Sequence, residues 1–481
     1  MNILLTVILG AALRFGSPVH FPVTLAGNFG EPRPNHFHGG IDIRTESSVG
    51  KPIFSIGEGY VSRVTVGMYG FGNAVYVQHP NGKTSVYCHL KDFPPAIRLE
   101  VTKYRKAHNQ QERIDEWRNP SEPADIYFRP MQLPVAKGQL IAISGNTGSS
   151  VAPHLHLEIH DTDTWAMRDP LESLKDGVTD HTPPKAHAFM AYPQQGEGLF
   201  CHSDKKQLFG FTSNHLEREF TAWGKVGFGL WANDYMEGTY HHYGIRKTEL
   251  VVDGHIVFTS DVDSIPAHHN RVVNAWGDFY HYLRNNVWYM KSFVDPGNPL
   301  PILQADESRG IVNFNEERLY QIVYVLTDAF GNQSSYSFQV RGTKEAMGRR
   351  HTTVSPKIYW NRVNNIQLPG MQLLVRRWQV ANDTPLQPDI IIKRNALSDA
   401  YRLAELPTPL FNGAQLSIRL KRKVADTGKL CIRSGDKSFG GTYHDGWVTA
   451  VVRDLNLFYE IGYDMKENKY QIKNKHVIIR S

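Results

Sequence analysis

The sequence has little cysteine: its 481 residues include only Cys88, Cys201 and Cys431, which lie far apart. An odd number of cysteines without a C-x-x-C pair excludes a disulfide framework and a cysteine-based zinc knuckle. The sequence also contains no Walker loop, no G-x-G-x-x-G in a strand–helix context and no nucleic-acid-binding motif. We therefore expect no nucleic-acid partner.

Long apolar runs are also scarce. The run at residues 3–13 has the length of the hydrophobic part of a secretory signal and is too short to span a bilayer. No Lys or Arg precedes it, and a buried first strand or helix is the alternative. We expect residues 1–13 to be a signal segment of a protein exported to the periplasm, the cell envelope or the extracellular space. We expect no transmembrane helix.

The composition is that of folded material, with 41% hydrophobic, 11% aromatic and 21% charged residues, and it excludes extended disorder. The length predicts about two to four domains. A formal net charge of +6 fits an anionic polymer or surface as a partner. It fits equally well a soluble protein with a slight excess of Lys and Arg.

The chain is predicted to be all-β. Residues 14–178 contain short alternating segments with glycine-rich breaks, and the Asn81–Gly82 pair predicts a hairpin between residues 74–78 and 84–90. Residues 91–134 interrupt this domain as a charged, proline-bounded insert, which we expect to be partly helical.

A proline-marked linker follows the first domain and leads into strands at the spacing of a β-sandwich. Residues 320–326 and 335–340 are expected to pair across residues 328–332. We predict an immunoglobulin-like sandwich at residues 179–342 and a further β domain at residues 343–481.

Three short segments carry side chains able to do chemistry. In "NHFHGGIDIRT", strand alternation would place His38, Gly40 and Asp42 on one face, with the glycine leaving space for an ion. A His and an Asp on one face are suitable zinc ligands. A surface pair beside a turn is the alternative.

In "PHLHLEIH", alternation places His154, His156, Glu158 and His160 on one face and three apolar residues on the other. Two neighbouring imidazoles can reach one centre, one as a ligand and one beside a bound water. The alternative is a group of exposed histidines on an edge strand.

In "SVYCHL", alternation predicts that Tyr87 and His89 share one face, opposite Val86 and Cys88. A lone strand histidine is usually structural, but the preceding hairpin can bring this one opposite the other two segments.

Other histidines have weaker patterns. His36 and His160 are expected to be neighbours of the site or surface residues, because three ligands already suffice. The doublets at residues 241–242 and 268–269 have no acidic or cysteine partner at ligand spacing and are expected to be structural.

Taken together, H-x-G-x-D, Y-x-H-L and S-G-N-T-G followed by P-H-L-H resemble, in this order, the lysostaphin/LytM-type zinc metallopeptidases. These are peptidoglycan endopeptidases with a duplicated-hybrid-motif β fold. The resemblance covers residues 14–169. It implies one Zn²⁺ per chain with ligands His38, Asp42 and His156, and catalytic roles for His89 and His154.

Such a ligand set leaves the open coordination position that a catalytic zinc needs. One of the two catalytic histidines would act as general base, and the other would stabilise the oxyanion or protonate the leaving amine; the order stays open. The sequence departs from the family at Cys88, where small residues are common, and at the insert 91–134, which bears on the shape of the groove.

The resemblance implies an exported zinc endopeptidase that hydrolyses peptide cross-links of peptidoglycan, with stem or bridge peptides as substrates. The C-terminal β domains would position it on the wall, a membrane surface or a cell-envelope protein partner. Two alternatives remain. One is a non-catalytic LytM-like scaffold that binds the wall and activates another hydrolase. The other is a surface binding protein that acts through its immunoglobulin-like domain.

Overall fold

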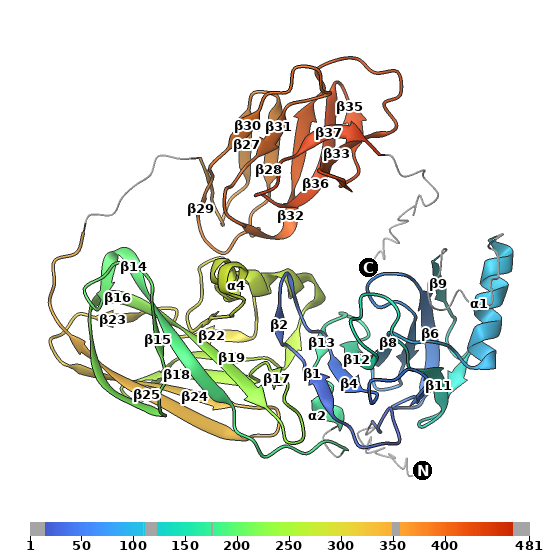
Figure 1. Ribbon diagram of the computed structural model, residues 1–481, viewed down its shortest axis with the longest axis horizontal. Helices are drawn as coiled ribbons and strands as arrows, with labels where there is room; N and C mark the ends of the chain where they lie inside the picture. Colours follow the sequence, from blue (N-terminus) through green and yellow to red (C-terminus); the bar gives the residue numbers. More distant parts are fainter. Residues whose placement is uncertain (1–14, 109, 111–122, 175–176, 349–355, 465–481) are drawn as a thin grey trace, which may run out of the picture. The chain divides into compact units, whose positions relative to one another are not determined.

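The structure, a computed structural model, describes residues 15–108, 110, 123–174, 177–348 and 356–464 (Figure 1). The expected signal segment at residues 1–13 lies outside this range. Contacts divide the chain into two compact units, one within residues 1–294 and 300–351 and the other within residues 295–299 and 352–481. Strands dominate both units, so the all-β prediction is confirmed. Among the described residues, no helix is both long and apolar enough to cross a membrane.

The first sheet of the first unit has ten strands, and its main path runs β1-β4-β12-β8-β7-β6-β10. The strands on this path are β1 (Leu25–Gly27), β4 (Ile41–Arg44), β12 (His154–Asp161), β8 (Lys83–Cys88), β7 (Ala74–Gln78), β6 (Gly59–Val66) and β10 (Pro134–Val135). Strand β12 pairs on one side with β4 and on the other with β8. The histidine-rich stretch is therefore a central strand, and the edge-strand alternative is wrong.

The predicted hairpin is present. β7 and β8 pair with Gln78 opposite Thr84, and Gly82 takes the positive φ of +74° that the turn needs. Two further pairs, β2 (Pro32–Arg33) with β3 (His36–Phe37) and β5 (Pro52–Phe54) with β11 (Leu140–Ile143), flank the sheet.

The insert 91–134 contains helix α1 (Pro95–Ala107), as expected of a partly helical segment. Proline at the first helical position fits because its missing N–H has no partner there in any case. Ile97 and Val101 are buried in the domain core. The insert returns to the sheet through β9 (Ala124–Tyr127), which pairs with β6. Its residues 109 and 111–122 lie outside the described residues.

The second sheet of this unit has eleven strands, on the path β15-β14-β16-β25-β24-β18-β19-β22, with β17, β21 and β23 paired to β16. Its strands are β14 (Lys185–Phe200), β15 (Gln207–Gly210), β16 (His215–Tyr235), β17 (His242–Tyr243), β18 (Lys247–Val252), β19 (His255–Asp261), β21 (Met290–Lys291), β22 (Leu303–Ala305), β23 (Val312–Phe314), β24 (Leu319–Thr327) and β25 (Gln333–Gly342). The expected pairing across residues 328–332 is confirmed as the β24–β25 hairpin. The immunoglobulin assignment stays a prediction.

The part of the first unit up to residue 178 and the part after it contact each other directly. Strand β13 (Met167–Arg168), which pairs with β12, also pairs with β20 (Ser264–Ile265) from the second half of the unit. The hydroxyl of Tyr243 donates to the carbonyl of Leu25 at 2.9 Å. Short helices lie at this junction and beyond it: α2 (Leu171–Leu174), η2 (Ala267–Val272), α3 (Val273–Trp276) and α4 (Phe279–Asn285). The predicted boundary at residues 178/179 stays a prediction, and the segments on its two sides share a sheet.

The second unit is also built of strands, in a five-stranded sheet, a three-stranded sheet and two strand pairs. The five-stranded sheet contains β27 (Asn364–Leu368), β28 (Met371–Val375), β32 (Pro409–Arg419), β36 (Trp447–Asp454) and β35 (Thr442–His444). The remaining strands are β34 (Lys437–Ser438), β33 (Leu430–Ser434), β37 (Glu460–Tyr463), β26 (Lys357–Ile358), β29 (Thr384–Pro385), β30 (Asp389–Ile391) and β31 (Ala400–Arg402). Its own core includes Leu373, Leu416 and Val448.

Candidate metal centre and active site

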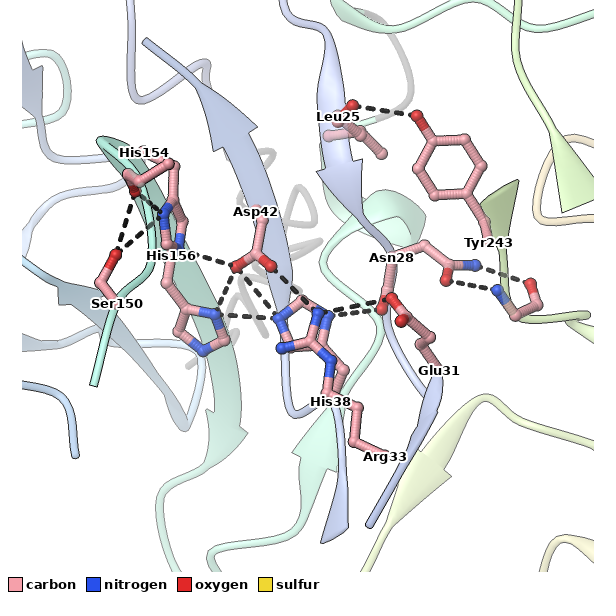
Figure 2. Close-up of polar contacts among 12 residues, drawn as sticks. Leu25, Asn28, Glu31, Arg33, His38, Asp42, Ser150, His154, His156 and Tyr243 are labelled. Carbon is pink, nitrogen blue, oxygen red and sulfur yellow. Dashed lines mark hydrogen bonds and ion pairs between the residues drawn. The ribbon is translucent and has the colours of Figure 1, made fainter. Parts of the chain in front are cut away.

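Three of the predicted site residues converge on one point. Nε2 of His38 lies 3.1 Å from Oδ1 of Asp42 and 3.0 Å from Nδ1 of His156. The same Nδ1 lies 2.8 Å from Oδ1 of Asp42. All three side chains are buried. Figure 2 shows the two rings and the carboxylate pointing toward one another.

Strand pairing brings Asp42 and His156 together, because they are directly opposite in the β4–β12 ladder. The apolar residues between the polar ones lie on the other face, in the core, as the alternation predicts; they are Ile41, Ile43, Leu155, Leu157 and Ile159. The sheet therefore presents one polar and one apolar face at this point.

The prediction that His38, Gly40 and Asp42 lie on one continuous strand is wrong. β3 ends at Phe37 and β4 begins at Ile41, so His38 reaches Asp42 from the connection between two strands. Gly40 also does not leave room for an ion. A Cβ there would lie 2.1 Å from the carbonyl oxygen of Leu157, so the glycine allows the neighbouring backbone to approach.

The two candidate histidine ligands each donate a hydrogen bond from the ring nitrogen that faces away from the group. Nδ1–H of His38 donates to the carbonyl of Asn28 at 2.6 Å, and Nε2–H of His156 donates to Oε1 of Glu158 at 2.9 Å. The other oxygen of Glu158 accepts from Nε2–H of His160 at 2.6 Å. Glu158 and His160 are both buried, so they fix the ring of His156 and are not surface residues.

The two predicted catalytic histidines stand beside this group. Nδ1–H of His154 donates to the carbonyl of Ala152 at 2.7 Å, and its Nε2 lies 3.3 Å from Oδ1 of Asp42. Nδ1–H of His89 donates to the carbonyl of Thr147 at 2.9 Å. The two rings have centroids 4.8 Å apart. In both rings the carbonyl bond places the proton of the neutral ring on Nδ1, so that Nε2 is unprotonated.

In the "SVYCHL" strand Tyr87 lies opposite Val86 and Cys88 as expected, but the expectation that His89 shares the face of Tyr87 is wrong. Tyr87 is buried in the core, whereas Cys88 is opposite His156 in the ladder and shares its face. His89 has a φ of +63°, just after β8 ends, and this left-handed residue breaks the alternation. The turn brings its ring to the polar face. Burial raises the pKa of the Cys88 thiol well above its ordinary value, which keeps it protonated beside the site.

The electrostatics of the group suit a cation. Burial alone would raise the pKa of Asp42, but His38, His154 and His156 hold it well below its usual range. Burial would likewise raise the pKa of Glu158, and its bonds to His156 and His160 lower it instead. Both carboxylates are therefore ionised at neutral pH.

The environment of His89 favours its neutral form, in contrast to the two carboxylates, which are held in their charged form. Burial, followed by the nearby His156 and His154 rings, lowers its pKa to about 4. This ring is therefore neutral at pH 7 and can accept a proton.

The residues fit zinc by their donor set. Two imidazole nitrogens and one carboxylate oxygen, all within 4.8 Å of one another, are a typical three-ligand set for Zn²⁺. Arg33 lies 3.1 Å from the other oxygen of Asp42, so Oδ1 is the oxygen directed at the metal position. His36 is exposed and takes no part in this group.

The group of His38, Asp42 and His156 lies in the wall of a cleft with a volume of about 880 Å³. All five predicted site residues line it, and so do Tyr240, His241 and Asn270 from the second half of the first unit. These three residues were not predicted as site residues from the sequence, and the 241–242 doublet was expected to be structural. Nothing in their spacing indicates the cleft, because the packing of the two halves brings them there.

Two protein-family models match parts of this chain. Residues 36–103 match peptidase family M23. The resemblance to lysostaphin/LytM-type peptidases is thereby confirmed. The domain that contains residues 36–103 is called the M23-like domain, and its ten-stranded sheet is called the M23-like sheet. Residues 355–464, in the second unit, match the model of the Zu5-like domain. No curated protein matches the chain.

Several solved structures are similar to part of this chain. The catalytic domain of lysostaphin from Staphylococcus simulans is 20% identical, with 31% of this chain and 90% of that chain covered and a TM-score of 0.21. The catalytic domain of the prophage-encoded M23 protein EnpA from Enterococcus faecalis is 21% identical, with 30% and 85% covered and a TM-score of 0.20. A zinc-containing peptidase from Vibrio cholerae is 24% identical, with 30% and 36% covered and a TM-score of 0.21.

Proposed function

We propose that this protein is an exported zinc endopeptidase that hydrolyses peptide cross-links of peptidoglycan. The observation that carries the proposal is the meeting of His38, Asp42, His156, His89 and His154 at the base of one cleft. These residues come from segments far apart in the sequence. A purely structural histidine cluster would not need the separate hydrogen bonds that direct each free nitrogen inward.

In this proposal His38, Asp42 and His156 hold one Zn²⁺. Bound zinc lowers the pKa of water and polarises a carbonyl oxygen. The chain's own part is to move protons: the free Nε2 of His89 or His154 accepts the proton of the attacking water. The ring that takes this proton can pass it from Nε2 to the leaving amine, so that water and an amide become a carboxylate and an amine. The other ring can stabilise the developing oxyanion only when it is itself protonated at Nε2.

The cleft supports a peptide substrate. One of its walls is the M23-like domain, and the other includes Tyr240 and His241. A cleft with two walls accommodates an extended strand of peptide and excludes bulk water from the reacting bond. The second unit, with its Zu5-like match, would hold the enzyme at the cell envelope or on a partner protein.

The test is digestion of defined peptidoglycan by the full chain, with and without a chelator and after zinc is restored. Mass spectrometry should show cross-linked peptides cut in the zinc-loaded sample and intact in the chelated one. His154→Ala should abolish cleavage, whereas His255→Ala, at an exposed strand position, should cleave normally. Zinc-loaded protein that releases no product from any cross-link type would overturn the proposal and favour a non-catalytic scaffold.

A further inference from the structure

A second group of potential metal ligands lies in the first unit, away from the histidines. It consists of Asp180, Asp234 and Asp328, each of which places a carboxylate oxygen within 4.8 Å of the other two. Their exposed fractions are 3%, 5% and 3%. Asp180 precedes β14, Asp234 lies near the end of β16, and Asp328 follows β24.

In the part of the chain that the structure describes, the three carboxylates have no cationic partner. Among the described residues, no Lys, Arg or His side chain forms an ion pair with any of them. Oδ2 of Asp180 and Oδ1 of Asp234 are buried and accept no hydrogen bond. Glu237, which affects the pKa of Asp180, adds a further carboxylate next to the group. Burying unpaired charge is costly, so a compensating ion or proton is required.

The group is also held in place by its surroundings. Oδ1 of Asp328 accepts from the backbone amides of Phe330 and Asn332, both at 2.8 Å. The side-chain amide of Asn332 donates to Oδ2 of Asp328 at 2.7 Å and to the carbonyl of Asp180 at 3.1 Å. Oδ1 of Asp180 accepts from the amide of Thr182 at 3.0 Å. These bonds fix two of the three carboxylates and leave the buried free oxygens for a ligand.

We propose that Asp180, Asp234 and Asp328 bind one Ca²⁺ ion. Calcium prefers carboxylate and carbonyl oxygens and accepts irregular geometry, which suits a site assembled from a linker, a strand end and a turn. Two positive charges offset most of the negative charge of the group. The site is independent of the peptidase proposal, because none of its residues lines the histidine cleft.

Calcium at this position would strengthen the junction within the first unit. Asp234 is opposite Tyr243 in the β16–β17 ladder, and Tyr243 bonds to Leu25 on β1 of the M23-like sheet (Figure 2). Asp180 belongs to the segment that leads from one sheet to the other. The ion would therefore tie this segment to β16 and to the β24–β25 turn, which lie close to that contact.

The test uses the full chain, stripped of metals by a chelating resin and then reloaded with one equivalent of Zn²⁺, in calcium titration calorimetry and in thermal unfolding. Wild-type protein should bind about one Ca²⁺ beyond the zinc and unfold at a higher temperature when calcium is present. Asp234→Asn should lower calcium affinity by at least about tenfold. The control Asp204→Asn, at an exposed aspartate, should bind as wild type.

The ion-free protein gives an independent readout. Because the substitution removes one of three mutually repelling charges, Asp234→Asn should unfold at the same or a higher temperature than wild type without calcium, and lower than wild type with it. If this variant does not fold, Asp180→Asn takes its place. Absence of saturable calcium binding by the wild type would overturn the proposal. The proposal would also be overturned if lower pH raised the unfolding temperature and calcium had no effect, because the three carboxylates would then be neutralised by shared protons.

Discussion

Nδ1 of His156 lies 2.8 Å from Oδ1 of Asp42, although the two residues are 114 positions apart in the sequence. The β4–β12 ladder sets this distance, because the two residues are directly opposite and their side chains leave the sheet on the same face. Any change in the register of β4 and β12 would move Asp42 and His156 away from each other. The β4–β12 ladder therefore positions two of the three candidate ligands, and the connection between β3 and β4 supplies the third, His38.

Removing a metal ligand and removing a proton carrier should have different effects. We expect Asp42→Ala to lose most zinc affinity, because one of three ligands and its negative charge disappear. His154→Ala should retain zinc and lose turnover. Zinc content by atomic absorption and cleavage of defined muropeptides separate the two outcomes. Full activity of His154→Ala would show that its assigned role is wrong.

Glu158 should tune the metal site without touching the metal. Glu158→Gln weakens the bond that fixes the ring of His156, and loss of such a partner typically lowers metal affinity by about 10–100-fold. Competition with a chromogenic chelator measures the change. Glu219→Gln is the control, because its carboxylate pairs with Arg341 at the exposed surface. Equal zinc affinity of wild type and Glu158→Gln would contradict this role.

Gly40 should not tolerate a side chain. A Cβ would lie 2.1 Å from the carbonyl oxygen of Leu157, so Gly40→Ala must push β4 away from β12. We expect a loss of about 2 kcal/mol or more in the free energy of unfolding, together with weaker zinc binding. Denaturant unfolding tests this. Gly177→Ala, which meets no atom within 4 Å, should leave both quantities close to wild type.

Protonation of Asp278 in acid should lower the free energy of unfolding of the first unit. Burial would raise its pKa, but the Lys206 ammonium at 2.5 Å and the amide of His281 lower it below the ordinary 3.8. Because the folded pKa is depressed, this stabilisation is present above the unfolded pKa and disappears as the pH falls through the folded one.

Asp278→Asn keeps a side chain able to cap α4 and removes only the charge. We expect it to cost about 1 kcal/mol at pH 7, with the difference from wild type shrinking toward pH 3. Denaturant unfolding at both pH values measures it. A difference that does not change with pH would show that packing, and not charge, is responsible.

Much of the M23-like domain could be predicted from local patterns. Alternation identified the apolar face of β12 and the Asn81–Gly82 pair identified the β7–β8 hairpin, since both depend on residues close in sequence. The same reasoning failed for His89. Its left-handed backbone follows from the packing of the strand end against the loop that holds Thr147, and no local pattern encodes this contact.

The sequence by itself determined which chemical groups are available and which side of each strand is apolar, because side-chain alternation is a local property of the backbone. Only the tertiary structure decided that Gly40 serves strand packing, that Glu158 holds His156, and that His89 turns toward the cleft. It alone gathered Asp180, Asp234 and Asp328, whose spacing along the chain carries no signal. These relationships depend on cross-strand register and on backbone turns, which are set by contacts between distant segments.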